Sequence, residues 1–197
     1  MLALFSIAAA LSVADHSGMF GRLGPDRQRY DRAVATVSRI VDGDTFVIDV
    51  PDGSAPSTRV RLLGVDCPEI AQNTGDTDAF FGREASEWAA TNLLGRRMRI
   101  VLDPTQPVRD KHGRLLAYLF DASSHGGDAK SINQRLIEEG LSYADWRFEH
   151  VHAMRFERAE RLAMRAKIGL WRGVKREQMP QWRQKMAPNR DRQTRRD

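Results

Sequence analysis

Three acidic side chains, Asp44, Asp66 and Glu69, have the types and spacing of a metal-assisted hydrolytic site. Asp44 lies in the segment DGDTF and Asp66 in RLLGVDCPE, and each adjoins a stretch that is typical of a β-strand. Two carboxylates, a backbone carbonyl and waters form an oxygen-only ligand set that suits a hard cation such as Ca²⁺. Glu69 lies three residues after Asp66, close enough to orient or deprotonate a metal-bound water.

Two arginines, Arg61 and Arg114, add the positive charge that phosphate chemistry requires. Each guanidinium has a planar fork that matches two phosphate oxygens. A cation, a base and two guanidiniums around one point suit hydrolysis of a phosphodiester, because the charge on pentacoordinate phosphorus needs fixed positive partners. Taken one at a time, each of these residues also has an ordinary structural explanation, such as a turn carboxylate or a surface arginine.

The dipeptide Asp42-Gly43 is typical of a tight hairpin turn, since glycine tolerates a positive φ. A turn alone does not require the second carboxylate at Asp44. We therefore expect this turn to deliver a metal ligand, with Thr45 steadying the loop.

The residues around these side chains predict a mixed α+β fold. Alternating or apolar runs indicate strands over 34–40, 44–50, 57–65, 96–102 and 114–120. Helical spacing of apolar residues predicts helices over 82–94, 131–140 and 149–168, with Ser131 as an N-cap. A helix after the third of five strands is the order of an OB-type barrel. We expect one domain, a five-stranded barrel with about three packed helices.

The two ends of the chain differ from this domain, which we place at 33–171. Residues 1–14 are apolar and end in small residues, which predicts a cleaved signal peptide and a secreted or periplasmic protein; an uncleaved membrane anchor is the alternative. Residues 15–32 are polar and predict a linker. Residues 172–197 contain nine Lys/Arg against three Asp/Glu, which predicts a basic disordered tail and explains the net charge of +5.

Cysteine, histidine and tryptophan side chains give no further site. Cys67 is the one cysteine of the sequence, which excludes an intramolecular disulfide and a cysteine-based zinc site. We expect it to be a small side chain beside the metal loop. His125, His150 and His152 lack ligand-like partners and are expected at the surface, whereas Trp88 is expected in the core.

Six motifs in the same order resemble the staphylococcal nuclease, or thermonuclease, family: IVDGDTFVI, RVRLLGVDCPE, FGREAS, DKHGRLLAYLF, INQRLIEEGLSYA and AKIGLW. The resemblance extends over about residues 33–171. It implies an OB-fold domain that binds Ca²⁺ and cleaves DNA and RNA to 3′-phosphate products. It also implies a monomer that prefers single-stranded or frayed substrates and needs no protein partner.

The resemblance implies roles for individual residues. Asp44 and Asp66 match the calcium carboxylates, and the backbone carbonyl of Cys67 matches a further calcium ligand. The guanidiniums of Arg61 and Arg114 match the catalytic arginines. Glu69 matches the glutamate that is assigned as general base.

Four more residues match substrate contacts of that family. Lys111 and His112 stand where the family contacts the terminal phosphate of a nucleotide. Trp146 and Phe148 stand where two tyrosines contact the nucleotide. Both can stack on a base, but neither supplies a phenolic hydroxyl to a phosphate.

Two other functions remain open from the sequence alone. One is a non-catalytic nucleic-acid-binding module on the same barrel, and the other is an anchored surface protein whose basic tail binds anionic polymers. The presence of all five charged side chains, Asp44, Arg61, Asp66, Glu69 and Arg114, favours the enzyme over the module. The barrel fold by itself does not distinguish these functions.

Overall fold

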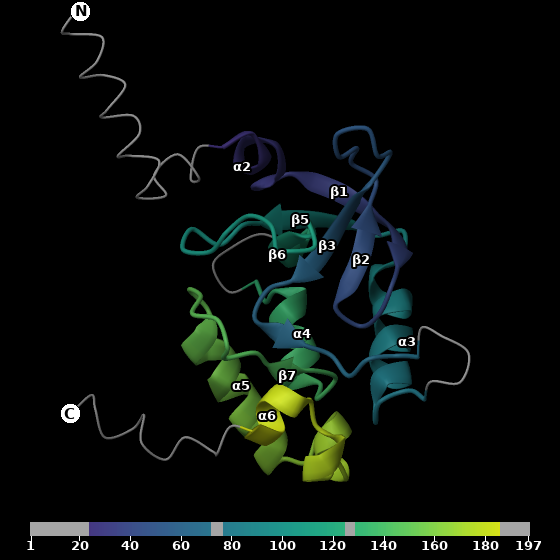
Figure 1. Cartoon of the computed structure of the whole chain (residues 1–197), viewed down its shortest axis with the longest axis vertical. Coiled ribbons are helices and arrows are strands. Elements are labelled where there is room, and N and C mark those ends of the chain that lie inside the picture. Colours follow the sequence, from purple (N-terminus) through teal and green to yellow (C-terminus); the bar gives the residue numbers. More distant parts are fainter. Residues whose placement is uncertain (1–23, 72–76, 125–128, 186–197) are drawn as a thin grey trace, which may run out of the picture.

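A computed structural model describes residues 24–71, 77–124 and 129–185 (Figure 1). Five strands close into a barrel in the order β1 (Val34–Ile40), β2 (Thr45–Ile48), β3 (Thr58–Leu62), β6 (Leu115–Asp121) and β5 (Arg97–Val101). Strands β3 and β6 pair in parallel, and the other neighbours pair antiparallel. The predicted five-stranded OB-type barrel and the mixed α+β class are confirmed.

The strand pattern separates the barrel interior from the side that carries charge. In β3, Val60 and Leu62 are buried, whereas Arg59 before them is exposed and Arg61 between them is partly exposed. Each such aliphatic side chain contributes about 1.5–3 kcal/mol when it is removed from water. The same alternation directs Arg61 away from the interior, as the sequence predicted.

Of the three longer helices, α3 (Gly82–Leu93) and α4 (Ile132–Glu138) pack on the barrel, and α5 (Ala153–Arg165) packs mainly against α4 (Figure 1). The N-cap at Ser131 is confirmed, since its hydroxyl accepts the Gln134 N–H at 3.1 Å. Helix α5 begins later than the predicted residue 149, because the chain first turns at His150, whose carbonyl accepts the Ala153 N–H. A small antiparallel pair, β4 (Val65–Asp66) and β7 (Tyr143–Ala144), lies between the barrel and these helices.

The prediction that His150 lies at the surface is wrong. Its side chain is buried, and Nδ1 lies 2.9 Å from the hydroxyl of Tyr118. That hydroxyl also lies 2.7 Å from Oδ2 of Asp103, so the histidine belongs to a buried polar network. His152 is half-buried against the Tyr118 ring, and His125 lies outside the described residues.

The linker predicted over 15–32 is wrong for its last part, where helix α2 (Pro25–Tyr30) packs on the barrel. Tyr30 is fully buried, and its hydroxyl lies 3.1 Å from Oγ1 of Thr58. Arg27 donates to the carbonyl of Asp103 at 2.7 Å. A helix of six residues is not stable by itself, so these tertiary contacts hold it. The predicted signal peptide over 1–14 lies outside the described residues.

The tail predicted from residue 172 onward is also wrong for the residues up to 185. Two short 3₁₀ helices, η1 (Gly169–Arg172) and η2 (Arg176–Gln178), lead into helix α6 (Gln181–Lys185). Figure 1 shows α6 in yellow beside α5 and β7. Residues 186–197 lie outside the described part of the chain. None of the helices within the described ranges is both long and apolar enough to cross a membrane.

Candidate active site

The turn between β1 and β2 delivers Asp44. Oδ1 of Asp42 accepts the backbone N–H groups of Asp44 at 3.0 Å and Thr45 at 2.7 Å, so the first carboxylate organises the turn itself. The carboxylate of Asp44 is therefore not needed to form the turn and can bind another group, although this side chain is only 1% exposed. The hydroxyl of Thr45 donates to Oδ1 of Asp44 at 3.2 Å, as expected of a residue that steadies the loop.

Gly43 is required by close packing and does not have the positive φ that the sequence predicted. A Cβ at this position would lie 2.9 Å from the Cβ atoms of Ala85 and Cys67. The turn is therefore pressed against helix α3 and against the segment that follows β4. A larger residue here would displace Asp44 from the site.

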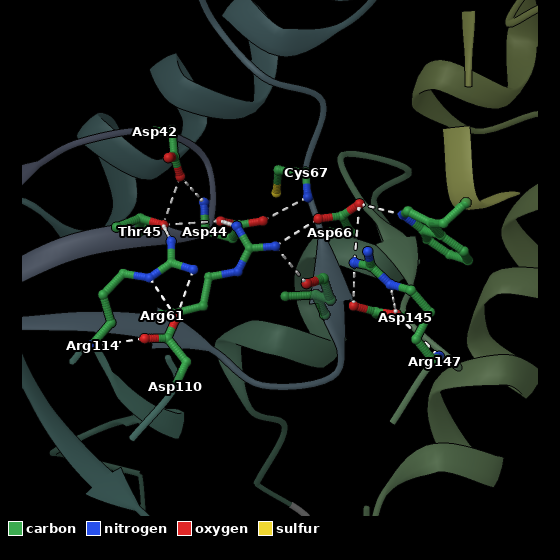
Figure 2. A network of polar contacts seen from close by, with 12 residues as sticks. Asp42, Asp44, Thr45, Arg61, Asp66, Cys67, Asp110, Arg114, Asp145 and Arg147 are labelled. Atoms are coloured by element: carbon green, nitrogen blue, oxygen red, sulfur yellow. Dashed lines mark hydrogen bonds and ion pairs between the residues drawn. The ribbon is translucent and has the colours of Figure 1, made fainter. Parts of the chain in front are cut away.

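Arg61 joins the two predicted metal ligands (Figure 2). Its register partner across β2 and β3 is Thr45, which places the guanidinium beside Asp44. One guanidinium nitrogen donates to Oδ1 of Asp44, and the other donates to Oδ1 of Asp66 at 2.6 Å. The strand ends thus bring both carboxylates together, as the barrel topology predicted.

Burial disfavours the charged form of Asp44. Burial raises the pKa of Asp44, and the charges of Asp42 and Asp66 act in the same direction, whereas Arg61 opposes them. The Cys67 N–H donates to Oδ2 of Asp44 at 2.6 Å and stabilises the charged form in part. Carboxylates held close together with one guanidinium leave a demand for further positive charge.

The donor set fits a hard cation bound mainly by oxygen. Within the residues that the structure describes, no group of three or more His, Cys, Asp or Glu side chains is gathered to hold a metal. A cation would therefore depend on the carboxylates of Asp44 and Asp66 together with backbone and water oxygens, which Ca²⁺ accepts readily. Burial raises the pKa of the Cys67 thiol, so that side chain is a neutral filler beside the site.

Glu69 lies on the segment between β4 and α3. Its backbone carbonyl accepts the Ala79 N–H at 2.9 Å, and a Cβ on Gly82 would lie 2.4 Å from the same oxygen. The start of α3 thus holds the backbone of Glu69 in place while the side chain stays exposed. Partial burial raises the pKa of Glu69, with a further contribution from the charge of Asp42.

Arg114 comes from the turn that leads into β6. Asp110 organises this turn: Oδ1 accepts the backbone N–H groups of His112 and Arg114, and Oδ2 accepts Nε of Arg114 at 2.8 Å. Nη1 of Arg114 lies 3.4 Å from Oγ1 of Thr45, next to Asp44 (Figure 2). The parallel pairing of β3 with β6 brings this second guanidinium to the Arg61 cluster.

The predicted substrate-contact residues lie around this cluster. Lys111 and His112 are exposed on the Arg114 turn. Phe148 is half exposed, and Trp146 is half-buried beside an indole from the end of the chain. No measurement on the structure tests their contact with a nucleotide, and they remain predictions.

Sequence reasoning missed two residues of the site. One is Asp110, which orients Arg114. The sequence pattern that could have revealed it is an aspartate four residues before an arginine, with a glycine turn between them. Trp182 donates its indole N–H to Oδ2 of Asp66 at 2.7 Å, across 116 positions of sequence. Because the segment around it has no apolar period, sequence patterns assigned this tryptophan no role.

Comparison with known proteins agrees with this geometry. The family model described as staphylococcal nuclease homologue matches residues 59–173, more than half of the chain. The thermonuclease of Staphylococcus intermedius is 33% identical over 136 residues, which cover 68% of this chain and 74% of the relative.

Two further relatives carry nuclease names. The micrococcal nuclease of Shigella flexneri is 27% identical over 150 residues, covering 75% of this chain and 78% of the relative. Endonuclease YncB of Bacillus subtilis is 29% identical over 140 residues, covering 69% of this chain and 60% of the relative. The matching family model and the similarity to the thermonuclease, together with the barrel, show that this chain belongs to the staphylococcal nuclease homologue family.

Proposed function

We propose that this protein is a Ca²⁺-dependent phosphodiesterase that hydrolyses DNA and RNA to 3′-phosphate products. Membership of the family and its nuclease-named relatives support the nuclease activity. The single observation that carries the proposal is the Arg61 guanidinium shared between Asp44 and Asp66, with Arg114 beside them. This arrangement combines surplus carboxylate with two planar cations at one point.

Asp44, Asp66 and the backbone carbonyl of Cys67 would hold the calcium ion. Bound there, Ca²⁺ would supply Lewis-acid stabilisation of the phosphoryl oxygens. The burial of Asp44 supports this assignment, because a cation offsets the free energy that burial of the carboxylate costs.

Glu69 orients the attacking water and accepts its proton. The water oxygen bonds to phosphorus while the bond to the 5′-oxygen breaks, which leaves the phosphate on the 3′ side. Arg61 and Arg114 hold the phosphoryl oxygens and stabilise the charge that develops on them. The hydrogen bonds from Arg114 to Asp110 keep its fork oriented before the substrate arrives.

Single-stranded or frayed strands are the expected substrates. Trp146 and Phe148 offer ring surfaces for stacking on unpaired bases, and Lys111 and His112 offer positive or hydrogen-bonding groups to a terminal phosphate. We infer that the protein acts as a monomer outside the cytosol, where calcium is abundant, after removal of residues 1–14.

The alternative is a non-catalytic nucleic-acid-binding module on the same barrel. Digestion of single-stranded DNA by the full chain, with Ca²⁺ and with EGTA, separates the two functions. The nuclease requires cleavage only with Ca²⁺ and a fall of about 10²–10⁴-fold in Arg114→Ala and Glu69→Gln. Arg83→Gln is the matched control, because Arg83 pairs with Asp78 in an exposed position. Retained binding without cleavage would favour the module.

A further inference from the structure

The end of the described chain returns to the candidate active site. After α5 and η1, helix α6 lies beside β7 and α5 (Figure 1). Helix α6 has five residues, too few to be stable without tertiary contacts. Its position must therefore be set by the side chains that it buries.

Arg183 anchors α6 to α5. Its two guanidinium nitrogens donate to the two carboxylate oxygens of Glu160 at 2.9 and 3.0 Å. Both side chains are buried, with 8% of Arg183 and 4% of Glu160 exposed. Glu160 also accepts the N–H of Ala144 in β7, so the pair ties α6 to the small sheet that contains Asp66.

Aromatic rings enclose the Arg183 guanidinium on several sides. It lies 4.4 Å from the centroid of Trp146, 5.1 Å from Tyr143 and 5.2 Å from Trp171. A desolvated, bidentate and ring-packed arginine has little freedom to move. The residue next to it, Trp182, is thus presented to the active site from a rigid anchor.

Trp182 donates to the oxygen of Asp66 that Arg61 does not bind. Its Nε1 lies 2.7 Å from Oδ2, while Arg61 takes Oδ1 at 2.6 Å. Hydrogen bonds to both oxygens fix the plane of the carboxylate. The Arg147 guanidinium lies 4.6 Å from the Trp182 ring centroid and pairs more closely with Asp145 (2.7 Å) than with Asp66 (3.7 Å).

A tryptophan suits this task chemically. An indole N–H donates one hydrogen bond and carries no charge, so it orients Asp66 without neutralising it. A carboxylate has about four lone-pair directions, and two donors leave room for a cation. Hydrogen-bonded partners of metal-binding carboxylates commonly tune the affinity for the metal.

We propose that Trp182 is a positioning residue that holds the Asp66 carboxylate in the orientation that binds Ca²⁺, an inference that rests on the proposed function. The Glu160–Arg183 pair is the anchor that delivers it. The matched family region ends at residue 173, so Trp182 and Arg183 lie beyond that match, whereas Glu160 lies within it.

The chain contains a matched control for this interaction. Trp88 in α3 donates its indole N–H to Oε2 of Glu139 at 2.6 Å, and the Arg135 guanidinium lies 5.0 Å from its ring centroid. An indole, a carboxylate and a guanidinium are therefore combined here too, away from the predicted metal ligands. Replacement of Trp88 by Phe removes the same kind of hydrogen bond without touching Asp66.

The test is calorimetric titration of Ca²⁺ into the full chain, Trp182→Phe and Trp88→Phe, with urea unfolding to verify the fold of each. Phenylalanine keeps most of the ring packing and removes only the donor. We expect the dissociation constant to rise about 10- to 100-fold in Trp182→Phe and to stay unchanged in Trp88→Phe. The nuclease rate of Trp182→Phe should recover when Ca²⁺ is raised to saturation.

Glu160→Gln provides a second route to the same effect, because it weakens the anchor and leaves Trp182 in place. We expect weaker Ca²⁺ binding together with faster proteolysis after residue 172. Wild-type affinity in both Trp182→Phe and Glu160→Gln would overturn the positioning role alone. A wild-type chain that binds no Ca²⁺ would overturn the calcium dependence of the proposed function, and this inference with it.

Discussion

Two arginines in this protein each hold a pair of aspartates, and their surroundings differ. Arg61 joins Asp44 and Asp66 at the candidate active site. Arg109 joins Asp26 of α2 and Asp52, with hydrogen bonds of 2.6–3.2 Å to both carboxylates. The pairing chemistry is the same in the two clusters.

Burial separates the two clusters. Asp44 is 1% exposed, and burial raises its pKa in spite of Arg61. Asp26 is 39% exposed, and its hydrogen bonds with Arg109 lower its pKa. Burial thus disfavours the charged form of Asp44 even beside Arg61, whereas Asp26 stays in contact with water and its charged form is stabilised by Arg109. The two clusters therefore differ in burial, and the buried one is the candidate active site.

The largest expected effect is on catalysis. Arg61→Gln removes a fixed positive partner of the phosphoryl group, so the rate of single-turnover DNA cleavage should fall about 100- to 1,000-fold. Arg109→Gln should change that rate by no more than about twofold. Equal losses in the two variants would mean that the comparison between the clusters has no functional meaning.

The second expected effect is on stabilisation by calcium. At about 100 times its dissociation constant, Ca²⁺ should raise the free energy of unfolding by about 2.7 kcal/mol in the wild type and in Arg109→Gln. Asp66→Asn should respond far less, because a ligand carboxylate has lost its charge. Urea unfolding in Ca²⁺ and in EGTA measures this difference, and an undiminished response in Asp66→Asn would contradict it.

A smaller effect is expected on stability without calcium. Arg109→Gln breaks the contacts that hold α2 to the barrel, and we expect a loss of about 1 kcal/mol, since the partners are partly exposed. The shift of the urea midpoint at neutral pH measures it. Arg83→Gln, which breaks an exposed pair with Asp78, should leave the midpoint unchanged. Identical midpoints for the wild type and Arg109→Gln would assign the attachment of α2 to its other contacts, those of Tyr30 and Arg27.

The smallest expected effect is on the pH dependence of stability. The pKa of Asp26 lies below its usual value of 3.8 because Arg109 hydrogen-bonds to its charged form. Its contribution is complete above pH 3.8 and is lost as the pH falls through the lowered pKa. The variant lacks this contribution, so the difference in stability between the wild type and Arg109→Gln should be constant above pH 3.8 and should shrink as the pH falls below it. Unfolding midpoints between pH 6 and 2 measure this, and parallel curves would contradict it.

The sequence predicted the barrel and the central cluster because local patterns encode both. Strand alternation placed Val60, Leu62 and Arg61 on their correct sides, and the strand order brought Asp44 to Asp66. These features depend on residues close together in sequence or on a topology with few alternatives.

The two ends of the domain could not be predicted in the same way. Tyr30 is the one buried residue of α2, and in α6 the Arg183 side chain is buried while every residue as a whole keeps some exposure. Such segments show no apolar period, and partners far along the chain hold them, as Glu160 holds Arg183. Gly43 was a similar case, since its reason lies in contacts with Ala85 and Cys67.

The hydrogen bond between Trp182 and Asp66 also bears on the order in which parts of the protein fold. A nascent chain emerges from its N-terminus, and domains fold as their residues become available. All five barrel strands end by residue 121 and α5 ends at Arg165, so the fold can close before residue 182 has left the ribosome. The orientation of Asp66 is then among the last features of the molecule to be completed.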